Sequence, residues 1–292
     1  MKYNEGANLD PSQVGGGGGR TGGGGKIAIG GGAGVVVLIL ALLLGVNPGE
    51  LLGTGSGTDP GTSQAPASPF ARCTRGSDIG QDRNCRFVAY TNSIQDYWGG
   101  AVQDYQTIQV TTFTGQISTA CGTAPSQVGP FYCSGDTSVY LDLGFFDELT
   151  TTLGAKGGDA AEAYVLAHEF GHHVQDLEGT LQRVQGGSGG TGPTSSGVRL
   201  ELQADCYAGV WFNHATNDPG SPISEVTQAD LDDALDAAAA VGDDRIQKKM
   251  QGQVTPESWT HGSAANRQKW LTTGFTSGDP NACDTFRSGA LT

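Results

Sequence analysis

Two histidines and a glutamate stand close together in residues 167–173, in the pattern His-Glu-x-x-His. They are His168, Glu169 and His172. On an α-helix, residues four apart lie on the same face, so both imidazoles could bind one metal ion. Glu169 would be rotated by about 100° from His168, which places its carboxylate beside the ion. There it could take a proton from a metal-bound water. Neutral imidazoles favour zinc, so the segment predicts a zinc-dependent hydrolytic site.

The alternative is that these three side chains lie in solvent on one face of a helix, because a five-residue pattern also occurs by chance. The neighbouring residues argue against this. Residues 164–167 and Phe170 are apolar, which indicates that the helix is partly buried. Histidine and glutamate side chains that are buried without partners are costly, so we favour the metal site.

A catalytic zinc needs a third protein ligand and an open position for water. The metzincin pattern would place glycine at position 175 and histidine at position 178, but the chain has Gln175 and Glu178. A Glu-x-x-x-Asp pattern instead begins 29 residues after His172, at Glu201 and Asp205. We predict Glu201 as the third ligand, and Asp205 as the acceptor of the remaining N–H of a ligating histidine. The alternative is two carboxylates on a solvated helix face.

One more histidine is a candidate for catalysis. His261 lies in a predicted loop, directly before a predicted helix over residues 263–273. A tetrahedral intermediate needs hydrogen-bond donors aimed at its oxyanion, and loops readily deliver side chains into clefts. We therefore predict that His261 is catalytic, with an exposed or helix-capping histidine as the alternative. His214 would lie roughly 220° around its helix from Glu201, so we expect it outside the site.

The roles of three further side chains each have two possible interpretations. His173 would share a helix face with Glu169, and would either tune that carboxylate or hydrogen-bond to the backbone; we favour the backbone. Tyr132 and Tyr207 could donate a hydrogen bond to an oxyanion or could pack in the core, and the sequence does not separate these roles.

The elements that must position these residues change in type along the chain. Alternating β-branched residues predict a strand over residues 107–113, and two more short strands are predicted over 131–133 and 138–143. Apolar residues three and four apart predict long helices over 159–177 and 198–215, which carry the proposed ligands. Further helices are predicted over residues 87–102, 145–153, 227–240 and 263–273. A small sheet followed by helices indicates an α+β fold.

The cysteines indicate an oxidising compartment. All six follow residue 70 and none forms a Cys-x-x-Cys pair, which argues against a zinc ribbon and favours disulfides over buried thiols. Their spacing favours two short loops and one remaining pair, although other pairings are possible. The favoured pairs are Cys73–Cys85, Cys121–Cys133 and Cys206–Cys283.

Residues 27–46 carry no charge and follow Lys26. Twenty residues of helix span about 30 Å, the thickness of the bilayer core, so we predict a transmembrane helix. A cleaved signal peptide is the alternative, but the 26 residues before the segment are more than the charged N-terminal region of a signal peptide usually contains. Lys2, Arg20 and Lys26 precede the segment and no basic residue follows until Arg72, which predicts a cytoplasmic N-terminus.

These features predict four segments: a Gly-rich cytoplasmic tail (1–26), a transmembrane helix (27–46), a flexible linker (47–70) and an extracytoplasmic domain (71–292).

The chain has 16 basic and 30 acidic residues, for a net charge of −14. A surface this acidic repels phosphate backbones. We therefore expect no nucleic-acid partner.

Four blocks of the sequence resemble one protein family. HEFGHHVQ is followed by LQADCYAGVW, and the blocks GPFYCSGDTSVYLDLGFF and HGSAANRQKW lie on either side of them. Together they resemble the putative neutral zinc metallopeptidase family of bacterial membrane-anchored proteins. The resemblance implies a zincin-like fold, zinc and peptide-bond hydrolysis, with a peptide or protein substrate that it does not identify.

The sequence therefore predicts a membrane-anchored peptidase with one zinc ion per chain. His168, His172 and Glu201 would bind the zinc ion, and Glu169 would act as general base. Two alternatives stay open. One is a zinc-stabilised extracytoplasmic binding or scaffolding domain without turnover, against which Glu169 argues because a structural site needs no general base. The other is hydrolysis of a non-peptide amide of the cell envelope.

Overall fold

The computed structural model describes residues 1–16, 68–187 and 190–291. The predicted transmembrane helix over residues 27–46, and the linker up to residue 67, lie outside the described residues. Within the described part of the chain, no helix is both long enough and apolar enough to cross a bilayer.

The central sheet has four strands in the order β2-β3-β7-β6. Strand β3 pairs in parallel with both β2 and β7, whereas β6 runs antiparallel to β7. The strands are β2 (Val14–Gly16), β3 (Gln109–Phe113), β6 (Phe131–Cys133) and β7 (Ser138–Asp142). Two smaller pairs join β4 (Gln116–Thr119) to β5 (Gly122–Pro125), and β1 (Lys2–Tyr3) to β8 (Ile223–Glu225). The three strands predicted from the sequence are all present.

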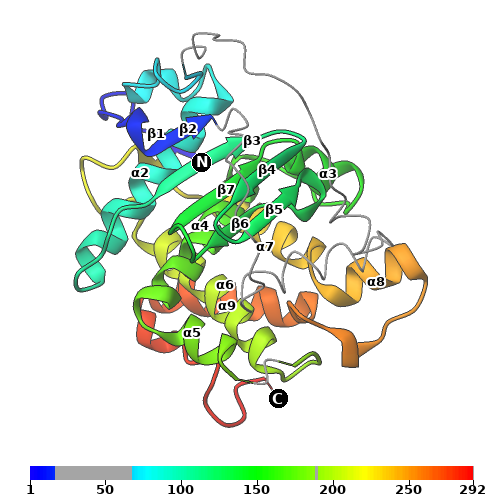
Figure 1. Cartoon of the computed structure of the whole chain (residues 1–292). Coiled ribbons are helices and arrows are strands. Elements are labelled where there is room, and N and C mark those ends of the chain that lie inside the picture. Colours follow the sequence, from blue (N-terminus) through cyan, green and yellow to red (C-terminus); the bar gives the residue numbers. More distant parts are fainter. Residues whose placement is uncertain (17–67, 188–189, 292) are drawn as a thin grey trace.

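Helices lie below this sheet and on both its left and its right in the view of Figure 1. They are α2 (Arg83–Ala101), α3 (Phe145–Thr151), α4 (Asp159–Leu177), α5 (Thr180–Gln185), α6 (Ser196–His214), α7 (Gln228–Ala240), α8 (Asp243–Gln251) and α9 (Ala264–Ser277). The six predicted helices are confirmed. Helix α4 begins and ends at the predicted residues, and α7 ends at the predicted residue. The short helices α5 and α8 were not predicted. The fold is mixed α+β, as expected.

Local sequence explains where the main helices start. Ser195 caps α6 by accepting a hydrogen bond from the backbone N–H of Val198. Thr227 and Asp230 form a reciprocal capping box at the start of α7, as their spacing predicts. Helix α4 is buried along almost its whole length, since only Asp159 and the last two residues keep notable exposure. A helix covered on all sides places its polar residues inside the protein.

A glycine lets α4 and α6 approach closely. A Cβ atom on Gly171 would lie 3.0 Å from both the Cα and the carbonyl oxygen of Ala204. Any larger residue at position 171 would push the two helices apart. Because His172 follows Gly171, and Glu201 lies one turn before Ala204, this contact brings the predicted ligands together.

The three disulfides are those that the spacing favours. Cys73 pairs with Cys85, Cys121 with Cys133, and Cys206 with Cys283, and no cysteine is free. The third bond joins residues 77 apart in sequence and ties α6 to the C-terminal segment. Each bond restricts the unfolded chain and so stabilises the folded one.

Residues 1–16 belong to the folded unit. Strand β1 pairs with β8, β2 pairs with β3, and Ala7, Leu9 and Val14 are buried. The sequence predicted a separate tail over residues 1–26, so the structure differs from that organisation in its first sixteen residues. The prediction gave too much weight to the glycine run, which begins only at Gly15, and too little to the apolar residues before it.

Candidate metal centre

Three predicted ligands meet between α4 and α6. One ligand atom each from His168, His172 and Glu201 lies within 4.8 Å of the other two. The Nε2 atom of His168 is 3.1 Å from Oε2 of Glu201, and Nε2 of His172 is 3.5 Å from Oε1 of the same carboxylate. All three side chains are buried. The two imidazole rings stand nearly perpendicular, at 87°.

The donor set and its spacing fit zinc. Zinc bonds of about 2.0–2.1 Å in a tetrahedron hold neighbouring ligand atoms about 3.3 Å apart. The two separations from Glu201, 3.1 Å to Oε2 and 3.5 Å to Oε1, are close to that value. Two imidazoles and one carboxylate leave a fourth position open, which is the composition of a catalytic rather than a structural site. Burial opposes ionisation of Glu201, but His172 and His261 outweigh it and hold the pKa of Glu201 well below its usual range.

Asp205 orients the first histidine. Its Oδ1 atom lies 2.9 Å from Nδ1 of His168, the contact predicted from the sequence. A carboxylate can only accept, so Nδ1 of His168 carries the proton and Nε2 keeps its lone pair for the metal. Tyr164 donates to the same Oδ1 atom over 2.6 Å.

Arg267 holds Asp205 from the opposite side. This arginine of α9 is buried, and donates to Oδ2 of Asp205 from Nε at 2.9 Å and to Oδ1 from Nη2 at 2.8 Å. Burial alone would raise the pKa of Asp205, but Arg267 and then His168 outweigh it and lower that pKa to about 2. The carboxylate that orients His168 is therefore fixed in both position and charge.

Gln175 orients the second histidine. Nδ1 of His172 lies 2.8 Å from Oε1 of Gln175, so this nitrogen donates and Nε2 is left for the metal. The amide nitrogen of Gln175 donates in turn to the backbone oxygen of Leu200 over 2.7 Å and to Oε1 of Gln203 over 3.1 Å. Helix α6 thus fixes both the glutamate ligand and the tautomer of His172.

Glu169 lies between His168 and His172 in the sequence of α4. Its side chain is buried, with 8% of the residue's surface exposed. No hydrogen bond or ion pair to its side chain occurs among the residues that the structure describes. Its neighbour in the sequence is the ligand His168, and its side chain has no competing protein partner in the described part of the chain, as a general base requires.

His261 reaches the centre from the loop before α9. Its Nε2 atom lies 4.0 Å from Oε2 of Glu201. The loop is held by Asp243, whose Oδ2 atom accepts backbone N–H groups of Thr260, His261 and Gly262 over 2.7, 2.7 and 2.8 Å. The structure therefore brings all six predicted site residues into one region.

The other candidates lie elsewhere or have other partners. His173 hydrogen-bonds to the backbone oxygen of Gln106 over 2.8 Å, which confirms the interpretation that we favoured. Tyr132 donates to Asp176 over 2.7 Å, and Tyr207 donates to Glu178 over 2.8 Å.

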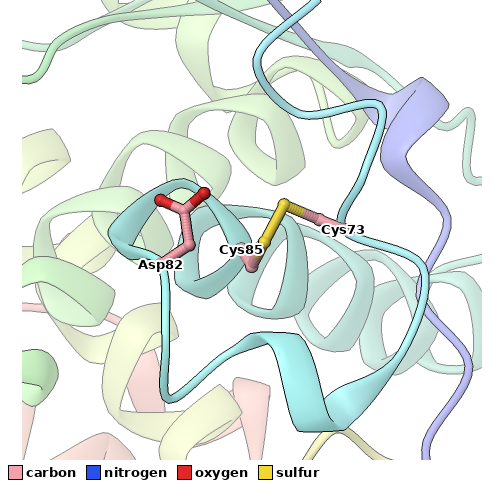
Figure 2. Close-up of side chains that lie close together, drawn as sticks. All are labelled: Cys73, Asp82 and Cys85. Carbon is pink, nitrogen blue, oxygen red and sulfur yellow. A yellow bond between two sulfur atoms is a disulfide. The ribbon is translucent and has the colours of Figure 1, made fainter.

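The remaining histidine, His214, contacts the backbone oxygen of Gly278 over 2.8 Å and stacks on Tyr97. These partners lie outside the metal centre, as its position on the helix predicted. A second group of metal-binding residue types, Cys73, Asp82 and Cys85, is not a metal site, because its two sulfur atoms are joined in a disulfide (Figure 2).

Sequence reasoning missed four residues of the centre: Tyr164, Gln175, Asp243 and Arg267. Tyr164 was counted only as apolar, and Gln175 was used only to exclude metzincins. Arg267 lies in the block HGSAANRQKW, but nothing local indicates that an arginine there is buried against a carboxylate 62 positions away. Asp243 begins a helix that was not predicted.

Comparisons with known proteins agree with this geometry. The chain matches a family model described as putative neutral zinc metallopeptidase over residues 1–286, which confirms the resemblance found in the sequence. It is 48% identical over 256 residues to an uncharacterized protein of Mycobacterium tuberculosis strain H37Rv, covering 86% of each chain. It is 41% identical over 221 residues to the uncharacterized protein YpfJ of Escherichia coli strain K12, covering 73% of this chain and 75% of YpfJ. No solved structure matches the chain.

Proposed function

This chain belongs to the putative neutral zinc metallopeptidase family, and we propose that it is a peptidase that uses one zinc ion per chain. The observation that carries the proposal is the buried group of His168, His172 and Glu201, with Glu169 beside it. Two nitrogens and one oxygen within 4.8 Å of one another leave a fourth position for a water, and the carboxylate of Glu169 could deprotonate that water. A zincin-like fold is part of the same proposal.

The roles of the side chains follow from their positions. When bound, zinc supplies a Lewis acid that lowers the pKa of a water and polarises the scissile carbonyl. Glu169 takes the proton from the attacking water and passes it to the leaving nitrogen. His261 donates a hydrogen bond to the oxygen that becomes negative in the tetrahedral intermediate. Asp205 and Gln175 hold the two histidines in the required tautomer.

The experiment that tests this function separates turnover from metal binding. The full chain and its Glu169→Gln variant are compared for zinc content and for cleavage of a peptide library. We expect equal zinc and a loss of cleavage, because only the proton acceptor is removed. Glu148→Gln changes an exposed glutamate and should keep both properties. Cleavage by Glu169→Gln at the normal rate would contradict the proposed general base.

Absence of any peptide cleavage by the zinc-loaded native chain would favour an alternative. The domain would then be a zinc-stabilised binding or scaffolding module, or would hydrolyse a non-peptide amide. A parallel screen of cell-envelope amides distinguishes these two.

We also propose that the domain works outside the cytoplasm, on a peptide or protein substrate. Its three disulfides support this location, because such bonds persist in oxidising compartments. Attachment to the membrane through residues 27–46 stays a prediction from the sequence, but the position of residues 1–16 in the fold argues against the cytoplasmic N-terminus predicted with it. The net charge of −14 continues to argue against a nucleic-acid partner.

A further inference from the structure

Residues 1–16 form a long contact with the domain that carries the metal centre. They lie beside α2 and β3 (Figure 1, blue). Strand β2 adds to the central sheet in register, with Val14 opposite Val110 and Gly16 opposite Thr112. Nearer the N-terminus, the backbone N–H of Leu9 donates to the carbonyl oxygen of Thr74 over 3.0 Å. The contact therefore combines strand pairing at one end with loop hydrogen bonds in its middle.

Two buried polar side chains of α2 hydrogen-bond to this segment. Asn92 accepts from the backbone N–H of Asp10 over 2.8 Å and donates to the backbone oxygen of Asp10 over 3.1 Å. Gln95 donates to Oε1 of Gln13 over 2.8 Å. Asn92 and Gln95 are only 6% and 2% exposed. Residues 1–16 both pack against Asn92 and supply its hydrogen-bond partners, so this buried side chain is satisfied by the docked segment.

The domain is also shaped to receive the segment. A Cβ atom on Gly76 would lie 1.8 Å from the backbone oxygen of Asn4, so only glycine permits this approach. At the start of the segment, the hydroxyl of Tyr3 donates to Asp159 over 2.7 Å. Asp159 is the first residue of α4, the helix that carries two metal ligands. The segment thus contacts the same helix that forms the metal centre.

We infer that residues 1–16 lie in the same compartment as the metal centre. A chain that crossed a membrane once between residues 16 and 68 would place these two parts on opposite sides, where they could not form one fold. Lys2, one of the residues that predicted a cytoplasmic N-terminus, forms an ion pair with Glu225 of β8. Taken with the disulfides, this places both parts outside the cytoplasm. The inference does not depend on peptidase activity.

Labelling of cysteine variants in intact cells tests this inference. Lys2 and Glu225 are partners across β1 and β8, and their side chains are 71% and 46% exposed. Each is changed separately to cysteine in the full chain, and the cells are treated with a membrane-impermeant maleimide before and after lysis. We expect Lys2→Cys and Glu225→Cys to be labelled equally in intact cells. The native chain, whose cysteines are all paired, is the blank.

The outcomes are distinct. Labelling of Glu225→Cys in intact cells, with Lys2→Cys labelled only after lysis, would overturn the inference and restore a single crossing. Protection of both until lysis would support a shared compartment but contradict the extracytoplasmic location. Ser12→Cys, at a second exposed position of the segment, should behave as Lys2→Cys does. A discrepancy between these two would also overturn the inference.

The double variant Lys2→Cys/Glu225→Cys tests the docking itself. Cβ atoms of facing residues in antiparallel strands lie about 4.5–5.5 Å apart, close enough for a disulfide after a small adjustment. Oxidation should therefore remove the labelling that each single variant shows. Persistent labelling of both cysteines would mean that the segment is not seated on β8.

Discussion

The metal centre and the N-terminal segment differ in how far apart their interacting residues lie in the sequence. The centre takes three of its residues from a single turn of α4, at His168, Glu169 and His172. The segment 1–16 makes its contacts with residues that lie far along the chain, such as Thr74, Asn92 and Val110. A local pattern can be recognised in one sequence, whereas a docking surface spread over distant residues cannot. The predictions below test whether the two regions are also separable in energy and function.

The largest effect is expected from the ligands. His168→Ala and Glu201→Ala should each abolish stoichiometric zinc binding, because the remaining two ligands cannot hold the ion tightly. Metal content of the purified full chain, measured by atomic spectroscopy, checks this. His214→Ala is the matched control, because this histidine lies outside the centre. Full zinc in Glu201→Ala would mean that the third ligand is another residue.

The next effect concerns catalysis without metal loss. His261→Ala should retain zinc and fold, but lower kcat by about 10²–10³, the usual cost of one oxyanion donor. Steady-state kinetics on a cleaved peptide, with zinc content measured in parallel, gives the result. An unchanged kcat in the zinc-loaded variant would remove His261 from the mechanism.

A smaller effect is expected from the partner of Asp205. Arg267→Met should weaken zinc binding by about 10- to 100-fold, as loss of an outer partner of a metal ligand typically does. Competition with a chelator of known affinity measures this. If Arg267 acts through Asp205, its replacement should add little in an Asp205→Asn background. Additive losses in the double variant would show that Arg267 has a separate structural role.

The sequence predicted the ligands because their spacing on two helices is itself the signal. It predicted helix α4 because Ala, Leu and Glu recur with helical period, and the disulfides because short loops favour pairing. It could not predict Arg267 or Asp243, since burial of a charged side chain depends on a distant partner. The same limitation applies to residues 1–16, where β2 has only three residues and its partner strand follows 93 positions later. Local composition there indicated a flexible tail.

The smallest effect should come from the docking of residues 1–16, and one glycine isolates it. In Gly76→Ala the new Cβ would meet the backbone oxygen of Asn4 at 1.8 Å, so the segment must move. We expect the free energy of unfolding to fall by about 1–3 kcal/mol, the usual cost of overpacking, and residues 1–16 to become sensitive to protease. Urea denaturation and limited proteolysis measure these effects.

The control for this change is Gly80→Ala, where an added Cβ has no atom within 4 Å. That variant should match the native chain in stability and protease resistance. Gly76→Ala should still bind zinc fully, because His168, His172 and Glu201 are held by contacts between α4, α6 and α9 that the segment does not make. Loss of zinc in Gly76→Ala alone would mean that the contact of Tyr3 with Asp159 carries strain into α4. The two regions would then form one cooperative unit, and the docking of residues 1–16 would be part of what positions the metal centre.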